Sequence, residues 1–314
     1  MKQKLIALAI ASALSAPAFA DNANITVYGK AFMTLESYDS GVNGEKSYMR
    51  VNTNASRFGV KGSDDLGEGL QGIYQYEVEM DADGSTGAGL GKTRNSGFGL
   101  KGDFGQVVLG IWDTPFKVAH NKIELFDNTT NWSATKVIGI SGGKDFNTRQ
   151  KNMVQYWSPK VGGLQAAVMY SPEEAAAAKK NNLSMSVTFE QDAIYAAVGY
   201  ESRPDQSAAN VTDTATRVVG QFDLGDAWIG AMVESMKVNS VSNNNTELVG
   251  AFKMGAGSIA ASITKQGSAG TDTTGVSLKY AYKFSKRTEG FLAYGSKKTS
   301  VTATTFGGGF MHSF

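Results

Sequence analysis

Cysteine is absent from the 314 residues, and neither sign of charge predominates. Without cysteine the chain has no disulfide framework and no thiolate metal site. The 30 basic residues are balanced by 29 acidic ones, so the strongly basic footprint of a nucleic-acid-binding protein is missing. Only two histidines occur, His120 and His312, too few and too far apart for a metal centre or a Ser–His pair. We therefore expect no cofactor, no metal, no catalytic residues and no enzyme activity.

Long apolar runs are also missing beyond the first twenty residues. The chain opens with two lysines, an uncharged apolar stretch at 5–16 and a small-x-small pattern at 18–20. This order predicts a signal peptide over residues 1–20, cleaved before Asp21. Its apolar part is too short to span a bilayer, and no later run approaches eighteen residues, so no transmembrane helix is expected. The predicted product is an exported single domain, residues 21–314.

Proline is scarce, at 5 residues, whereas glycine reaches 37 and aromatic residues 10%. That mixture favours strands joined by tight turns. Apolar and polar side chains alternate with a period of two, most clearly over 183–190 and 273–284. Sixteen strands are predicted, near 24–36, 47–62, 69–80, 94–102, 106–112, 149–157, 164–171, 183–190, 193–202, 214–223, 227–237, 246–254, 257–266, 273–284, 287–296 and 304–314.

The lengths of the connections alternate along the chain. Connections after even-numbered strands are short, such as 191–192 and 255–256, and those after odd-numbered strands are mostly longer and polar. The connection after the fifth strand, 113–148, is the longest. An up-and-down barrel, with turns at one rim and loops at the other, produces this pattern. A sandwich with Greek-key crossings gives no reason for it.

Alternation alone fits both a soluble sandwich and a membrane barrel. The two folds are distinguished by whether charged residues occur on the apolar faces. The apolar faces of 183–190, 193–202 and 273–284 carry no charged residue. A charge facing lipid would cost roughly 2–4 kcal/mol at the bilayer midplane. Tyr28 shares a face with Lys30 and is expected to point inward. The expected fold class is all-β, a 16-stranded antiparallel transmembrane β-barrel in the cell outer membrane.

Several short motifs, in order along the whole mature chain, resemble those of the Gram-negative general diffusion porins, in particular the β-proteobacterial type. They are Val27-Tyr28-Gly29-Lys30, residues 56–62 and 65–70, Arg94-Asn95-Ser96, Phe104-Gly105, residues 112–117, residues 156–159 and Phe310-Met311-His312-Ser313-Phe314. The resemblance implies a homotrimer of barrels in outer-membrane lipid. It also implies that the third external loop, here 113–148, folds inward and narrows the pore opposite a ladder of basic wall residues.

By motif position, the ladder is expected at Lys30, Arg57 and Arg94, with Arg149 or Lys151 as additions. Arg50 and Lys61 are further candidates, although a bulge in their strand would reverse the direction of either side chain. The loop lacks the Pro-Glu-Phe-Gly-Gly run that fixes the acidic residues in enteric porins. From composition we assign its acidic side to Asp113, Glu124 and Asp127.

The last strand ends in aromatic residues of one parity. Phe310, His312 and the terminal Phe314 match the signal that the outer-membrane assembly machinery reads in this class. The expected function is passive passage of ions and small hydrophilic solutes. The alternative is a substrate-selective outer-membrane channel, which would show aromatic residues along the lumen and a saturable, blockable conductance. A barrel enzyme lacks a nucleophile and histidine on neighbouring strands, and an adhesin lacks residues for an extra domain.

Overall fold

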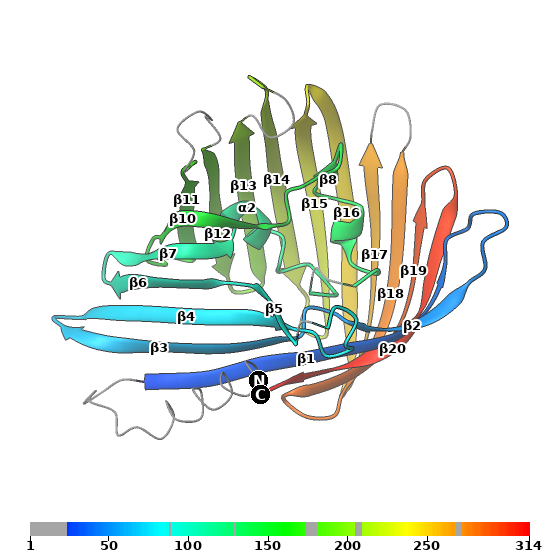
Figure 1. Cartoon of the computed structure of the whole chain (residues 1–314), viewed down its shortest axis with the longest axis horizontal. Helices are drawn as coiled ribbons and strands as arrows, with labels where there is room; N and C mark the ends of the chain where they lie inside the picture. Colours follow the sequence, from blue (N-terminus) through cyan, green and yellow to red (C-terminus); the bar gives the residue numbers. More distant parts are fainter. Residues whose placement is uncertain (1–23, 88, 128–129, 174–180, 205–208, 268–271) are drawn as a thin grey trace.

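The computed structural model describes residues 24–87, 89–127, 130–173, 181–204, 209–267 and 272–314. The predicted signal peptide, residues 1–20, lies outside them. Among the described residues, no helix is long and apolar enough to cross a membrane. Nearly all of the regular structure is antiparallel strand (Figure 1).

The sixteen predicted strands are confirmed, and two of them are each divided in two. The spans are β1 (Asn24–Asp39), β2 (Tyr48–Thr53) with β3 (Arg57–Gly67), β4 (Leu70–Met80), β5 (Leu90–Thr93) with β6 (Ser96–Gly102), β7 (Gly105–Asp113), β10 (Arg149–Trp157), β11 (Leu164–Ser171), β12 (Asn182–Gln191), β13 (Ile194–Pro204), β14 (Thr212–Asp223), β15 (Ala227–Val238), β16 (Val241–Met254), β17 (Gly257–Gly267), β18 (Thr273–Lys283), β19 (Thr288–Lys298) and β20 (Thr302–Ser313).

The sheet closes on itself because the first strand pairs with the last. β1 and β20 lie side by side in register from Lys30↔Ser313 to Asp39↔Thr304 (Figure 1). Every other span pairs with its neighbour in sequence. Closure leaves no open edge, which is the condition for strands to span lipid.

A bulge separates β2 from β3 and decides which way their side chains point. Ala55 takes a left-handed conformation, with φ of 51°. The Ser56 hydroxyl replaces the missing ladder partner, since its Oγ accepts from Phe32 N at 2.9 Å and donates to Phe32 O at 3.1 Å. The register shifts by one residue across the break, so Arg50 and Arg57, of opposite parity, both face the interior.

The barrel is apolar outside and charged inside, as the alternation predicted. Leu248 is 60% exposed on the outer face of β16, and Val198 of β13 is also exposed. On the inner face Arg217 is fully buried and Glu234 nearly so. A continuous exposed apolar surface around the wall fits a lipid solvent and not water.

The described residues of the connection 114–148, between β7 and β10, lie inside the barrel, where the green segment crosses its interior (Figure 1). This loop contains helix α2 (Pro115–Val118), the 3-10 turn η1 (Ala134–Lys136) and a small hairpin of β8 (Ile140–Ser141) and β9 (Lys144–Asp145). The Thr114 hydroxyl caps α2 by accepting from Lys117 N at 3.1 Å, and Pro115 occupies the first turn. The inward fold expected for the third external loop is present.

Three apolar clusters attach the loop to the inner wall. Loop residues Ile123 and Ile138 pack with β13–β16, Phe126 and Trp132 with β1, β18 and β19, and Phe116 and Phe146 with β14 and β15. The wall partners in these clusters are Tyr195, Ala197, Val219, Met232 and Val249, then Phe32, Ala281, Phe291 and Ala293, then Ala215, Met236 and Val238. These inward apolar positions break the polar pattern of the lumen where the loop covers them.

Buried polar contacts fix the loop further. Arg217 pairs with Glu234, whose other oxygen accepts from the loop amide Gly139 N at 2.8 Å. The His120 Nε2 atom lies 2.5 Å from Glu247 Oε2. The desolvated charges of Arg217 and Glu234 are tolerated because each has a partner of opposite sign.

We expect Leu248→Arg to destabilise the folded barrel by roughly 2–4 kcal/mol, because it places a charge against lipid in the middle of β16. Equilibrium denaturant unfolding from lipid vesicles measures the difference. Gln71→Arg is the control, since Gln71 lies on the inner face. Equal losses in both variants would contradict the assigned faces.

We expect Trp132→Ala to loosen the loop without opening the barrel. Trp132 is 1% exposed, donates from Nε1 to Thr305 O at 3.0 Å and meets the Phe291 ring at 5.9 Å. Truncation of this side chain should lower the free energy of unfolding by about 3–5 kcal/mol. Single-channel recording should show a larger and noisier conductance than wild type. An unchanged conductance would mean that the loop is held without this anchor.

Candidate functional site

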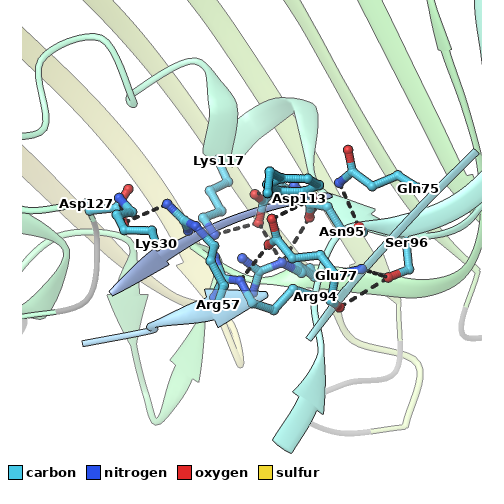
Figure 2. Close-up of polar contacts among 12 residues, drawn as sticks. Lys30, Arg57, Gln75, Glu77, Arg94, Asn95, Ser96, Asp113, Lys117 and Asp127 are labelled. Carbon is cyan, nitrogen blue, oxygen red and sulfur yellow. Dashed lines mark hydrogen bonds and ion pairs between the residues drawn. The ribbon is translucent and has the colours of Figure 1, made fainter. Parts of the chain in front are cut away.

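Oppositely charged side chains meet where the loop approaches the β1–β7 side of the wall (Figure 2). Lys30 on β1 and Arg57 on β3 are adjacent in the ladder, and both reach the loop carboxylate of Asp127. The Lys30 Nζ–Asp127 Oδ2 distance is 2.6 Å, and the Arg57 Nη2–Asp127 Oδ2 distance is 3.1 Å. The loop thus supplies the carboxylate, and the wall supplies the two basic side chains.

Arg94 extends the basic row, and it is paired with a carboxylate of the wall itself. Its Nε donates to Glu77 Oε1 at 2.7 Å, and both side chains are buried. Tyr28 donates its hydroxyl to the other Glu77 oxygen at 3.1 Å, so Tyr28 points inward as expected. Glu77 lies on β4 directly across from Gly59, two positions from the Arg57↔Glu79 pair.

A third group is centred on Asp113 at the end of β7. Lys117 Nζ lies 2.6 Å from Asp113 Oδ1, and Arg149 Nε lies 3.3 Å from the same oxygen. The Asn95 amide donates to Asp113 Oδ2 at 3.0 Å, and its carbonyl oxygen accepts from Arg149 Nε at 2.9 Å (Figure 2). Asn95 thereby bridges Asp113 and Arg149 through its two amide atoms.

These groups border two cavities, of about 420 and 540 Å³. Both are lined by Lys30, Arg57, Arg94, Asp113 and Asp127, so the charged row separates adjoining spaces. Lys117, Arg149 and Glu124 line the first and Glu77 the second. The two spaces are therefore bordered by five cations and four carboxylates, a net charge of +1.

The loop carboxylates differ in their electrostatic environment. Burial alone would raise the pKa of Asp127, but the positive charges of Arg57 and Lys30 outweigh it and hold that pKa below its usual range. Burial raises the pKa of Glu124, which also lies near Glu247. Glu124 accepts from Phe126 N at 2.9 Å and from the Ser133 hydroxyl at 2.8 Å, so it braces the loop's own fold. Asp127 is the loop acid that meets the wall.

Three of the predicted basic residues lie away from these cavities. Arg50 faces inward but pairs with Glu36 at 3.1 Å and stacks on Tyr38 and Tyr48. Lys61 lies four residues along β3 toward the short turns and lines a different cavity.

Lys151 falls in a bulge of β10 and does not line either space. The bulge arises because two residues, Lys151 and Asn152, oppose one residue of β7, and Asn152 takes a positive φ of 52°. The choice of Lys151 by motif position, as an alternative to Arg149, did not take this bulge into account.

Lys117 and Asn95 border the site and were missed at the sequence level. Lys117 follows Asp113 by four residues across a Pro-containing turn, a spacing that brings the two side chains together in a helical turn. Asn95 stands beside Arg94 in a motif that was assigned for its arginine alone. The loop anchors were missed too, although six large apolar residues in one connection between strands are a usable signal.

The terminal aromatic residues lie on the outer face. Phe310 and Phe314 are exposed, and Phe314 continues the ladder, since its N donates to Gly29 O at 3.1 Å. His312 Nδ1 lies 2.8 Å from the Thr288 hydroxyl. In the described part of the chain no group of three or more His, Asp or Glu side chains is arranged to hold a metal ion.

The comparisons with known proteins agree with this geometry. Outer membrane porin protein 32 of Delftia acidovorans is 25% identical over 328 residues, covering 96% of this chain and 92% of that protein. The solved anion-selective porin from Comamonas acidovorans superposes with a TM-score of 0.79 at 20% identity, covering 93% of this chain and all of that one.

The trimer form of OmpT from Vibrio cholerae superposes with a TM-score of 0.69 at 16% identity, covering 94% of this chain and 100% of its own. The Gram-negative porin family matches residues 7–302. A match over nearly the whole length, on a closed barrel with an inward loop, leaves one assignment: the chain belongs to the Gram-negative porin family.

Proposed function

We propose that this outer-membrane porin passes ions and small hydrophilic solutes through a pore whose constriction is the charged row between loop and wall. The observation that carries the proposal is the pairing of Asp127 on the loop with Lys30 and Arg57 on the wall. The basic side is Lys30, Arg57, Arg94 and Arg149, joined by Lys117, and the acidic side is Asp113 and Asp127, with Glu124 behind. Passage is passive, and no chemical step is required.

A barrel of sixteen strands encloses water, so charges at its narrow part remain ionised and act on passing ions. One unit charge about 5 Å from an ion in water is worth roughly 0.8 kcal/mol. Five cations against four carboxylates give a net positive field. We infer a preference for anions, in line with the anion-selective porin of similar fold. Added salt screens that preference.

The proposal extends to assembly. A fold shared with a porin solved as a trimer supports a homotrimer in outer-membrane lipid. The outward, terminal Phe310 and Phe314, with His312 between them, form a signal for the outer-membrane assembly machinery. Deletion of Phe314 should lower the amount of folded porin in the outer membrane, measured by fractionation, without altering the conductance of the molecules that do insert.

Neutralising the wall cations should shift selectivity toward cations. The variant Lys30→Gln, Arg57→Gln, Arg94→Gln removes three positive charges from the row, so the anion-to-cation permeability ratio should fall by about tenfold. The reversal potential under a salt gradient in a planar bilayer measures it. The control neutralises three cations at the short turns, Lys160, Lys286 and Arg287. An equal shift in both variants would remove the three wall residues from the constriction.

Removing the loop acid should act in the opposite direction. Asp127→Asn keeps the side-chain size but leaves Lys30 and Arg57 without their carboxylate. The permeability ratio should move toward anions by roughly threefold to fourfold. Asp145→Asn, in the same loop but outside both cavities, is the control. A shift toward cations in Asp127→Asn would refute the proposed constriction.

A further inference from the structure

A third cavity, of about 440 Å³, lies on the inner wall between the charged row and the rim of short turns. Side chains from five neighbouring spans, β1, β3, β4, β6 and β7, line it. In barrels of this class the short turns face the periplasm. A solute that has crossed the constriction therefore meets this cavity next, and its volume falls within the range of about 300–1,000 Å³ that is usual for small-molecule sites.

Two lysines of this cavity have no acidic partner. Among the described residues, no carboxylate lies within ion-pair distance of Lys61 or Lys101, and both side chains are exposed to the lumen. The Lys61 Nζ atom instead lies over the Tyr28 ring, 5.1 Å from its centroid. The constriction is different, because Lys30, Arg57, Arg94, Lys117 and Arg149 each have a carboxylate within 3.3 Å. Positive charge that is still free for an anionic solute thus lies below the constriction.

The same cavity has an aromatic and apolar side. Trp112 lines it and meets Trp157 edge to face, with ring centroids 5.8 Å apart. Both rings pack with Ile73 on the cluster around Val108. Large apolar side chains are unexpected on a water-filled lumen wall. The inward loop does not account for these side chains, because none of its residues belongs to their cluster. A planar apolar group of a solute would find both ring contact and exclusion from water on this side.

Side-chain amides complete the lining between the lysines and the tryptophans. Gln71 and Gln106 flank Lys101 on β4 and β7, where each is its direct cross-strand neighbour. Both line the cavity and offer donors and acceptors to polar substituents. Cation, amide and aromatic surface therefore occur together within one small space.

We propose that this vestibule is a binding subsite for small organic anions that carry a planar apolar group, such as aromatic carboxylates. The carboxylate lies between Lys61 and Lys101, and the ring lies against Trp112. The inference rests on the proposed pore function and adds a solute class to it. Occupancy of the subsite obstructs chloride flow, so such solutes block the current saturably.

The test is chloride current through the purified full-length porin in a planar bilayer, with benzoate added on the short-turn side. Benzoate should reduce the current saturably, whereas acetate, which lacks the ring, and benzamide, which lacks the charge, should block far less. Lys61→Gln with Lys101→Gln should raise the half-blocking benzoate concentration by about tenfold. Trp112→Leu should raise it for benzoate while leaving the weak effect of acetate unchanged.

The matched control is Lys253→Gln with Lys286→Gln, which removes two lysines at the same rim, one near the end of β16 and one in the turn between β18 and β19. Benzoate should block the current through this variant as it does in the wild type. Equal block by benzoate and acetate, or block that survives the Lys61 and Lys101 changes, would overturn the subsite. Absence of any chloride conductance in wild type would instead refute the pore itself, so the two failures are distinct. Unit chloride conductance in each variant shows that it has folded.

Discussion

The closed ladder of backbone hydrogen bonds is the constraint on which the rest of the molecule depends. Lipid offers no partner for a peptide N–H or C=O group, so every spanning strand must be paired on both sides. The β1–β20 register provides the last of these pairings. Once the sheet is closed, alternation forces one set of side chains toward lipid and the other toward water. Charged side chains such as Arg217 and Glu234 are tolerated inside the barrel because they form an ion pair there.

The inward loop forms a second layer that packs against the inner face of the barrel wall. Its apolar residues bind inner-face positions of β13–β19 that would otherwise be exposed to water, and its polar residues face the remaining space. Phe126 and Asp127 show the division most clearly, since one is buried against Phe291 and the next reaches Lys30 and Arg57. The position of the acid therefore follows from the packing of its neighbour. Electrostatics at the proposed constriction depends on hydrophobic contacts elsewhere in the loop.

Pairing of charges varies along the lumen. At the charged row each cation has its carboxylate, which restricts the side chains and leaves a small net charge. Toward the short turns Lys61 and Lys101 have none, and Trp112, not the loop carboxylates, lines their cavity. A solute thus passes from a region that orients it by opposed charges to one that contacts its charge and its apolar surface together. Both regions are lined by β1, β3 and β4, so a single part of the wall carries both sets of contacts.

The sequence by itself determined the barrel, the number of strands and, for regular strands such as 183–190 and 273–284, the side that faces lipid, because a period of two and alternating connection lengths are local properties. The resemblance of its motifs to those of the porin family also implied that Lys30, Arg57 and Arg94 share one region of the wall. Only the tertiary structure decided the position of Arg50, Lys61 and Lys151, because a bulge at Ala55 or Asn152 shifts register by one residue and reverses every side chain beyond it. Which loop acid meets the wall was likewise decided by contacts between residues far apart in sequence. Packing of the loop brings Asp127 to Lys30, although the two are 97 residues apart along the chain.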